Sequence, residues 1–565
     1  MAKRPSYPRG VPISINYPLM PVTELWRNSA RKFPDRDAVI YLNSRQSYGK
    51  LWDQMESFAA NLMGMGVRKG DRVALILPNC PQFLIAYNAI HLCGATVVAI
   101  NPLMSNPEIE REVLVTGSKI LIILDRLLEK LPEEHPALIV AEAAYYAPIH
   151  LRVLSGIKYR IKYPKDAYRF EDFLTGSKVD DYPAIDPQED VAVIMFTSGT
   201  TGEPKGVQLT HYSQIVNALQ SYHWLRGWGY SAKPQSAGWP IILCAMPFFH
   251  SYGLVVMNEA VSFGCTMMLL PNPTAETIIK ATHTHNVTHF PLIPRLIRQV
   301  MDYPSLDKYD LTSLTTCSSG GASIPIDVMK AFEELSGARM YQGYGLTEAG
   351  PIISATPVEG DPNYESTGLP YPDTEVKIMD LQLGEIEMQP NKDGEIIVRG
   401  PQLMKAYLND EESTKKVLRE GWLYTGDIGR IDEKGYLYIV GRKNDRIVAN
   451  GRTVWPTKVE ETLTSHPYIE YAIAFGVPDP LRCATDIRAM VVPRKGETGS
   501  EKFEKELLSL CADQLEAYMV PTKITFRESV PLTIMGKVDR KKIIAEIDAR
   551  INEIMQGEDI PEEYR

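Results

Sequence analysis

The sequence predicts an α/β protein with a large, layered α/β N-terminal domain and a small, mobile α+β C-terminal domain. In the first part of the chain, helical patterns alternate with apolar runs of strand length, which is typical of buried parallel strands covered by helices. Between Gly421 and Gly451 the pattern changes to short, glycine-punctuated strands. A chain of 565 residues also exceeds the usual size of one domain, so we expect more than one hydrophobic core.

Two helix–strand units follow one another near the N-terminus. Apolar residues recur at helical spacing over residues 51–63, glycines at 64 and 66 end the helix, and the apolar run VALIL follows at 73–77. The segment PQFLIAYNAIHLCG at 81–94 then predicts a helix, and TVVAI at 96–100 predicts a second buried strand. This alternation favours a parallel sheet.

A domain boundary is predicted where the glycine-punctuated hairpins end, near residues 442–445. We therefore expect an N-terminal domain over residues 1–443 and a C-terminal domain over residues 444–565, with a hinge at Asn444. The C-terminal part alternates helical and strand patterns. The predicted helices are KVEETLTSH and FEKELLSLCADQL, and the predicted strands are YAIAFGV, RAMVVP and KITFRE.

The composition excludes several classes of protein. The net charge of -10 gives no overall attraction to nucleic acid, so we expect no nucleic-acid partner. The seven cysteines are scattered and never spaced as CxxC, which argues against a disulfide framework and a thiolate zinc site. The N-terminus lacks the apolar segment of a signal peptide, and apolar runs fall short of the roughly 18 residues that span a membrane. We expect a cytoplasmic protein.

The strongest chemical signal is FTSGTTGEPKGVQLTH at 196–211, which follows the buried strand pattern VAVIMF. Its glycines, hydroxyl side chains and single lysine can direct N–H groups, O–H groups and a cation toward one polyphosphate. It is not a Walker A loop, because Pro204 and Gly206 flank Lys205. A simple Gly/Ser/Thr linker is the alternative, and the strand before it and the helix-like run after it argue against that interpretation.

This segment closely resembles the phosphate loop of the adenylate-forming superfamily, which contains acyl-CoA synthetases, luciferases and nonribosomal-peptide adenylation domains. Further motifs of that superfamily occur in its order and spacing, so the resemblance spans nearly the whole chain. They are PFFHSYGL (247–254), SSGGASIP (318–325), YQGYGLTEAGP (341–351), GWLYTGD (421–427), GRKNDRI (441–447) and PLTIMGKVDR (531–540).

The resemblance implies an ATP site, with residue roles that also make chemical sense. Glu348 offers a hard carboxylate oxygen for Mg²⁺, which Thr197 would also ligate, and Thr347 can donate to a phosphate. Small residues allow the adenine to approach the backbone, and Tyr344 can stack on it. The implied ATP-binding residues are Thr197, Ser198, Gly199, Thr200, Thr201, Gly202, Lys205, Gly321, Ala322, Gly343, Tyr344, Gly345, Thr347, Asp427, Arg442 and Lys537.

The resemblance also assigns roles around the ribose, the acyl group and the second substrate. Asp427, which we expect after a tight Thr-Gly turn, is acceptor-only and would bind the ribose hydroxyls beside Arg442. His250 would act as a gate between the acyl tunnel and the nucleotide. Lys537 would be the catalytic cation aimed at the reacting carboxylate and α-phosphate, and Gly451 would face coenzyme A.

Simpler structural interpretations stand beside these roles. A Thr-Glu pair commonly starts a helix, an isolated Gly-Arg is usually a surface charge, and a histidine among apolar residues is usually part of a core. A zinc site at His283, His285 and His289 is disfavoured, because a helix and a strand cannot present all three on one face. Asn444 and Lys458 depart from the superfamily, which usually has Asp or Lys at the first position and commonly Glu at the second.

The sequence thus predicts an AMP-forming acyl-CoA synthetase that uses ATP, Mg²⁺ and coenzyme A. The opening VTELWRNSARKFPDRDAVIY and the insertion HLRVLSGIKYRIKYPKD resemble medium- and long-chain fatty acyl-CoA synthetases. An aryl or other small-acid CoA ligase is the rival enzyme, and a nucleotide-binding protein without catalysis is the rival from another class. The insertion mixes Arg152, Lys158, Arg160, Lys162 and Lys165 with apolar residues, which suggests either a peripheral membrane contact or a solvated basic loop. A homodimer is a further hypothesis.

Overall fold

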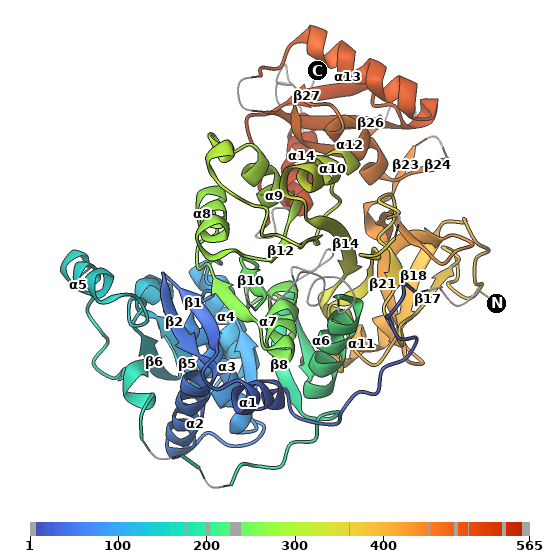
Figure 1. Cartoon of the computed structure of the whole chain (residues 1–565). Helices are drawn as coiled ribbons and strands as arrows, with labels where there is room; N and C mark the ends of the chain where they lie inside the picture. The colour runs from blue at the N-terminus through green and yellow to red at the C-terminus, as the bar shows by residue number, and fades with distance from the viewer. Residues whose placement is uncertain are drawn as a thin grey trace. The chain divides into compact units, whose positions relative to one another are not determined.

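The computed structural model describes the chain apart from residues 1–6, 160, 177, 180, 198–203, 226–238, 361, 450, 480–483, 495–496, 534–537 and 556–565. The chain divides into two compact units. Unit 1 comprises residues 1–376, 397–424 and 434–436, and unit 2 comprises residues 377–396, 425–433 and 437–565. Figure 1 shows the helices and strands in chain order. The predicted boundary before Asn444 remains a prediction.

An eight-stranded sheet in unit 1 contains the strands predicted at 73–77 and 96–100, which are β3 and β4. Among the strands from β3 to β8, every pair of neighbours in the sheet runs parallel, as predicted. Strand β9 instead runs antiparallel to both of its neighbours, β8 and β19. In sheet order the strands are β19 (Ala406–Tyr407), β9 (Lys205–Thr210), β8 (Val191–Thr197), β4 (Thr96–Ala99), β3 (Arg72–Ile76), β5 (Ile120–Leu124), β6 (Ala137–Ala141) and β7 (Tyr168–Arg169).

A nine-stranded sheet forms the second layered part of unit 1. Its six central strands, from β14 to β1 in sheet order, run parallel, and antiparallel strands complete both edges. In sheet order the strands are β16 (Leu369–Pro370), β15 (Ile352–Ala355), β14 (Arg339–Gly345), β13 (Thr316–Ser319), β12 (His289–Leu292), β10 (Ile241–Cys244), β11 (Thr266–Leu269), β1 (Asp37–Tyr41) and β2 (Ser44–Ser47).

Three smaller sheets follow in the later part of the chain. The hairpins expected between Gly421 and Gly451 are present, and the strand patterns near the C-terminus form a three-stranded sheet. The five-stranded sheet contains β17 (Glu375–Met379), β18 (Gly394–Arg399), β20 (Leu418–Arg419), β21 (Trp422–Ile431) and β22 (Leu437–Arg442); β23 (Ile447–Ala449) pairs with β24 (Arg452–Val454); β25 (Ile469–Asp479), β26 (Ala484–Pro493) and β27 (Lys523–Phe526) form the last sheet.

Most of the helices bury apolar residues, and the two helices expected at 51–63 and 81–94 are α2 and α3. Every residue of α3 is buried, which explains why its sequence is apolar all round. The helices are α1 (Thr23–Lys32), α2 (Tyr48–Gly64), α3 (Pro81–Leu92), α4 (Asn106–Thr116), α5 (Ile149–Lys158), α6 (His211–Leu225), α7 (Ser251–Phe263), α8 (Ala275–His285), α9 (Pro294–Met301), α10 (Ile326–Ser336), α11 (Glu411–Val417), α12 (Pro456–Thr464), α13 (Glu501–Gln514) and α14 (Arg540–Met555).

The C-terminal part of unit 2 has a hydrophobic core of its own. Val459 and Leu463 of α12 and Leu507 of α13 are fully buried in one cluster with strand residues such as Ala474 and Val491. The helix and strand patterns predicted there are therefore confirmed. The mixed α/β fold class is confirmed for the chain as well.

The helix-like run expected after the segment 196–211 is confirmed as α6, which begins at His211. Within the segment, residues 205–210 form strand β9, which the sequence analysis did not predict. Four of its six residues are buried, and its pairing with β8 and β19 defines it as a strand. The loop is thus the connection of a β-hairpin between β8 and β9.

Candidate active site

The two described ends of the phosphate loop lie opposite each other. Thr197 is the last residue of β8 and pairs with Lys205, the first residue of β9. The predicted phosphate-binding residues Ser198, Gly199, Thr200, Thr201 and Gly202 lie outside the described residues. The hairpin therefore places one predicted hydroxyl and the predicted lysine at the base of the loop.

Lys205 is held by residues some 200 positions later in the chain. Its Nζ donates to Ser413 Oγ at 2.5 Å, lies 3.7 Å from Asp410 Oδ2, and lies 5.0 Å from the centre of the Tyr407 ring. Hydrogen bonds from Ser413, with the Lys205 ammonium nearby, hold the pKa of Asp410 below its usual range. Because the Lys205–Asp410 pair is long and partly exposed, it is weak, and the ammonium can turn toward an incoming anion at little cost.

Tyr407 connects this lysine with the predicted magnesium ligand. Its Oη donates to Glu348 Oε1 at 2.8 Å, and its side chain is buried. Burial, together with the Glu348 carboxylate, raises the pKa of Tyr407 far above its usual value, so the phenol stays protonated and remains a donor. One tyrosine therefore contacts both a cation suited to phosphate and a carboxylate suited to Mg²⁺.

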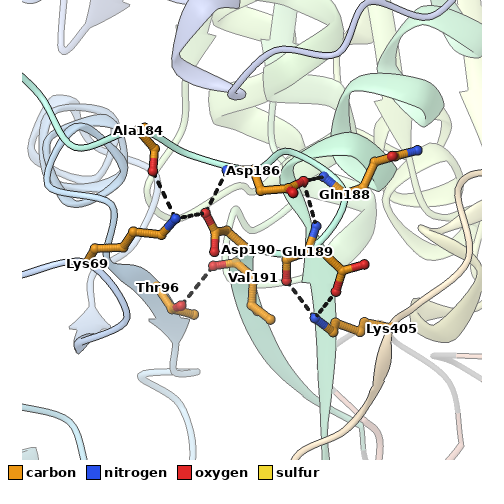
Figure 2. Close-up of polar contacts among 9 residues, drawn as sticks. All are labelled: Lys69, Thr96, Ala184, Asp186, Gln188, Glu189, Asp190, Val191 and Lys405. Carbon is orange, nitrogen blue, oxygen red and sulfur yellow. Dashed lines mark hydrogen bonds and ion pairs between the residues drawn. The ribbon is translucent and has the colours of Figure 1, made fainter.

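The strands that carry Lys205 and Tyr407 are fixed at their edges by ion pairs (Figure 2). Lys405, two residues before Tyr407, donates to Glu189 O at 2.7 Å and to Glu189 Oε2 at 2.8 Å. Lys69 contacts Asp190 Oδ2 at 2.7 Å, just before β8 begins. Exposed pairs of this kind add little stability, and here the Lys405 pair joins the segment before β19 to the segment before β8.

Three of the motifs converge around the start of α7. Ser251 Oγ lies 3.3 Å from Thr347 Oγ1, and Tyr252 Oη lies 2.9 Å from Ser318 Oγ. His250 is the N-cap of α7, and its Nδ1 accepts a hydrogen bond from Tyr252 N at 3.2 Å. The motifs at 247–254, 318–325 and 341–351 are therefore neighbours in space, although His250 itself has a capping role here.

The glycines predicted to bind ATP differ in what the backbone demands of them, and Gly321 is the one predicted to lie against the adenine. A Cβ on Gly345 would lie 2.0 Å from Pro351 O, so no larger residue fits, whereas a Cβ on Gly343 would meet Ser354 O at an ordinary 3.4 Å. Gly321 has φ +85° in the exposed loop after β13, next to Ala322. Tyr344, between the two β14 glycines, is partly exposed. Close packing of the strands thus accounts for Gly345 independently of adenine.

The predicted ribose-binding residues form an ion pair in unit 2. Asp427 of β21 and Arg442 of β22 are cross-strand partners, with Arg442 Nε 2.9 Å from Asp427 Oδ1. The tight turn expected before Asp427 is wrong, because Thr425 and Gly426 lie inside β21. Gly426 takes φ +70° within the strand, and Asp427 N donates to Thr425 Oγ1 at 3.0 Å. A glycine that bends a strand thus gave the same sequence pattern as a glycine in a turn.

The remaining predicted residues are spread over other segments. Asn444 lies in the short 3-10 helix η6 (Lys443–Asp445), and Gly451 has φ +74° between β23 and β24. Lys537 lies outside the described residues.

The three histidines have separate partners. His283 Nδ1 accepts from Asp310 N, His285 Nε2 contacts Asn43 Oδ1, and His289 Nδ1 contacts Thr288 Oγ1. Within the described part of the chain, no group of three or more His, Cys, Asp or Glu residues is arranged to hold a metal.

Sequence analysis missed several residues of this arrangement. Ser251 and Tyr252 lay inside a motif that we recognised, yet nothing in the motif indicated their partners. Tyr407 carried no signal at all, because its role depends on the pairing of β19 with β9 across some 200 residues. Ser413 was missed for the same reason.

Comparisons with known proteins identify the family of the chain. The profile of the family described as AMP-binding enzyme matches residues 26–408, and that of the AMP-binding enzyme C-terminal domain matches residues 458–537. A long-chain-fatty-acid–CoA ligase from Bacillus subtilis is 36% identical over 96% of this chain and 97% of its own length. One with the same name from Escherichia coli O157:H7 is 29% identical over 97% of this chain and 98% of its own. The crystal structure of the anthranilate CoA ligase AuaEII with anthranoyl-AMP has a TM-score of 0.81, at 22% identity, covering 94% of this chain and 98% of that one, which supports the fold.

Proposed function

Because the chain belongs to the AMP-binding enzyme family, we propose that it is an AMP-forming fatty acyl-CoA synthetase that uses ATP and coenzyme A. The observation that carries the proposal is Tyr407, which contacts both Lys205 and Glu348. That contact joins a cation suited to phosphate with a carboxylate suited to Mg²⁺. The full-length similarity to long-chain-fatty-acid–CoA ligases supports a fatty acid as the carboxylic substrate.

In the first half-reaction a carboxylate oxygen of the acid attacks the α-phosphorus of ATP. A new P–O bond forms as the bond to pyrophosphate breaks, which gives the acyl-adenylate. Attacker and target are both anionic, so the enzyme contributes mainly positioning and positive charge. Lys205 supplies one such charge at the base of the phosphate loop. Lys537 would supply another, aimed at the reacting carboxylate.

The residues present fit a magnesium ion that arrives with ATP. Mg²⁺ in nucleotide sites is usually held by one or two protein oxygens together with phosphates and waters. Glu348 and Thr197 would hold it, and it would neutralise phosphate charge. The hydrogen bond from Tyr407 fixes the orientation of the Glu348 carboxylate for this task.

The ribose would bind at Asp427. The two oxygens of its carboxylate can accept hydrogen bonds from both ribose hydroxyls while one of them stays paired with Arg442. The ion pair also orients the carboxylate before the nucleotide arrives. The cross-strand position of both residues suits a contact that recognises the ribose.

In the second half-reaction the thiol of coenzyme A attacks the acyl carbonyl, a C–S bond forms, and AMP leaves as the C–O bond breaks. We place the hinge for the accompanying domain rotation at Asn444. Its two neighbours are bound to different segments: Lys443 Nζ contacts Glu395 Oε2 of β18 at 2.6 Å, whereas Asp445 Oδ2 lies 3.8 Å from Arg540 Nε of α14. The Lys443–Glu395 pair is short, whereas the Asp445–Arg540 pair is long and weak, so a backbone rotation at Asn444 would meet little resistance on its C-terminal side.

The test is an assay of pyrophosphate exchange and AMP formation over a panel of acids. Labelled pyrophosphate should enter ATP without coenzyme A when a medium- or long-chain fatty acid is present, and coenzyme A should then release AMP. Exchange with aryl or other small acids in place of fatty acids would favour the rival ligase. ATP binding without exchange on any acid would point to the protein without catalysis.

Two partner predictions stay part of this proposal. A homodimer is one of them, and equilibrium sedimentation of the full chain tests it. The other is a peripheral membrane contact through the basic segment before the phosphate loop.

A further inference from the structure

Helix α5 (Ile149–Lys158) has no buried residue, although half of its residues are apolar. Ile149 is 79% exposed, Ile157 is 72% exposed, and Val153 and Leu154 are each more than half exposed. Figure 1 shows the helix at the periphery of unit 1, joined to the end of β6. Single exposed apolar residues are normal on a protein surface, but four on one short helix form a patch that calls for a partner.

The four side chains share one face of the helix. At 3.6 residues per turn, positions 149, 153 and 157 fall on one stripe and position 154 lies beside it. Ser155 points about 200° away from Val153. Arg126 donates to Ser155 Oγ at 2.5 Å and stacks on the Tyr159 ring at 3.4 Å. The helix is therefore attached to unit 1 through its polar side, which leaves the apolar face outward.

The charge around this face is opposite to that of the protein as a whole. The chain carries a net charge of -10, yet residues 149–166 contain five basic residues and one acidic residue. The side chains of Arg152, Lys158, Lys162 and Lys165 are exposed. An outward apolar face flanked by exposed cations is the pattern of helices that lie in the interface of an anionic membrane.

We propose that α5 is a docking surface for an anionic lipid bilayer. The apolar face formed by Ile149, Val153, Leu154 and Ile157 enters the boundary between headgroups and acyl chains, and the basic residues contact lipid phosphates. Among the described residues, no helix is long and apolar enough to cross a membrane. The proposal deepens the membrane contact named above by identifying its surface, and it does not depend on the proposed catalytic activity.

The experiment is co-sedimentation of the full-length protein with phosphatidylcholine vesicles, with and without phosphatidylglycerol. The protein should bind the anionic vesicles, and added salt should weaken the binding because it screens the charges. The double variant Ile149→Ser with Ile157→Ser should weaken binding about tenfold or more, since each isoleucine would otherwise leave water. Lys158→Glu with Lys162→Glu should weaken it to a similar degree and reduce its dependence on salt.

Matched control variants distinguish binding through this surface from nonspecific binding to vesicles. Leu383→Ser with Ile386→Ser removes two equally exposed apolar residues elsewhere, and Lys502→Glu with Lys505→Glu reverses two exposed lysines of α13. Both controls should bind vesicles like the wild type. Because the assay uses no ATP and no turnover, a failure of the proposed enzymatic function would leave its result unchanged.

Three outcomes would overturn the proposal. The first is no binding of the wild type to anionic vesicles. The second is equal binding by wild type and both α5 double variants. The third is loss of a dimer in sedimentation velocity on Ile149→Ser with Ile157→Ser while vesicle binding persists, because the face would then belong to a second copy of the chain.

Discussion

Replacing Tyr407 by phenylalanine should slow adenylate formation without unfolding the protein. The change removes only the Oη, which donates to Glu348 Oε1 at 2.8 Å, and keeps the ring against which Lys205 lies. A hydrogen bond to a charged group is worth about 1.5 to 3 kcal/mol. If Glu348 needs that bond to hold its orientation, the rate of adenylate formation should fall about 10-fold to 100-fold. A water molecule in place of the lost Oη would restore part of the hydrogen bonding, and the decrease in rate would then be closer to about 10-fold.

Pyrophosphate exchange measured over a range of Mg²⁺ concentrations would test this prediction. Tyr407→Phe should require more Mg²⁺ for half-maximal exchange, because the proposed metal ligand is less well oriented. Tyr17→Phe is a matched control, since Tyr17 Oη donates to Asp373 Oδ2 at 2.9 Å in another part of unit 1. That control should leave the Mg²⁺ dependence unchanged. Wild-type exchange by Tyr407→Phe at every Mg²⁺ concentration would refute the positioning role, and a lowered melting temperature alone would indicate a structural role.

Three further predictions concern Asp427 of the proposed ribose site, Lys537 and the closely packed Gly345. Asp427→Ala should weaken ATP binding far more than acid binding, since two contacts of about 1.5 to 3 kcal/mol each would be lost; equal losses in calorimetry would contradict a ribose role. Lys537→Ala should slow adenylation about 10² to 10³-fold and spare thioester formation from supplied acyl-adenylate; damage to both half-reactions would argue against domain rotation. Gly345→Ala should strongly lower the melting temperature, because its Cβ would lie 2.0 Å from a carbonyl oxygen, whereas Gly343→Ala should not; similar melting curves would contradict this packing argument.

The large sheets could be predicted from the sequence because parallel strands buried on both faces leave a local signal. Apolar runs such as VAVIMF have strand length and adjoin helical periods, so β8 and β3 needed no tertiary information. The family motifs added residue roles. Their spatial convergence at Ser251, Thr347 and Ser318 agrees with motifs that serve one site.

The parts that were missed leave weak local signals. Strand β9 is short, follows a loop rich in glycine, and pairs with β8 as a hairpin on one side and with β19, some 200 residues later, on the other. The contact of Tyr407 with Glu348 depends on that same pairing, so no local pattern could reveal it. Gly426 was misassigned because a glycine with positive φ occurs both in turns and within bent strands.

The position of the proposed hinge decides which substitutions affect which half-reaction. Asp427 and Arg442 both precede the tethered residue Lys443, whereas Gly451 and Lys537 both follow the tethered residue Asp445. A rotation at Asn444 would therefore leave the ribose pair on the β21–β22 hairpin and carry Lys537 away from it. Because Asn444 is uncharged, this rotation would rest on backbone freedom and on its two tethered neighbours. Asp427→Ala should then impair both half-reactions, and Lys537→Ala only the first; this outcome in the two assays would place the hinge between residues 427 and 537.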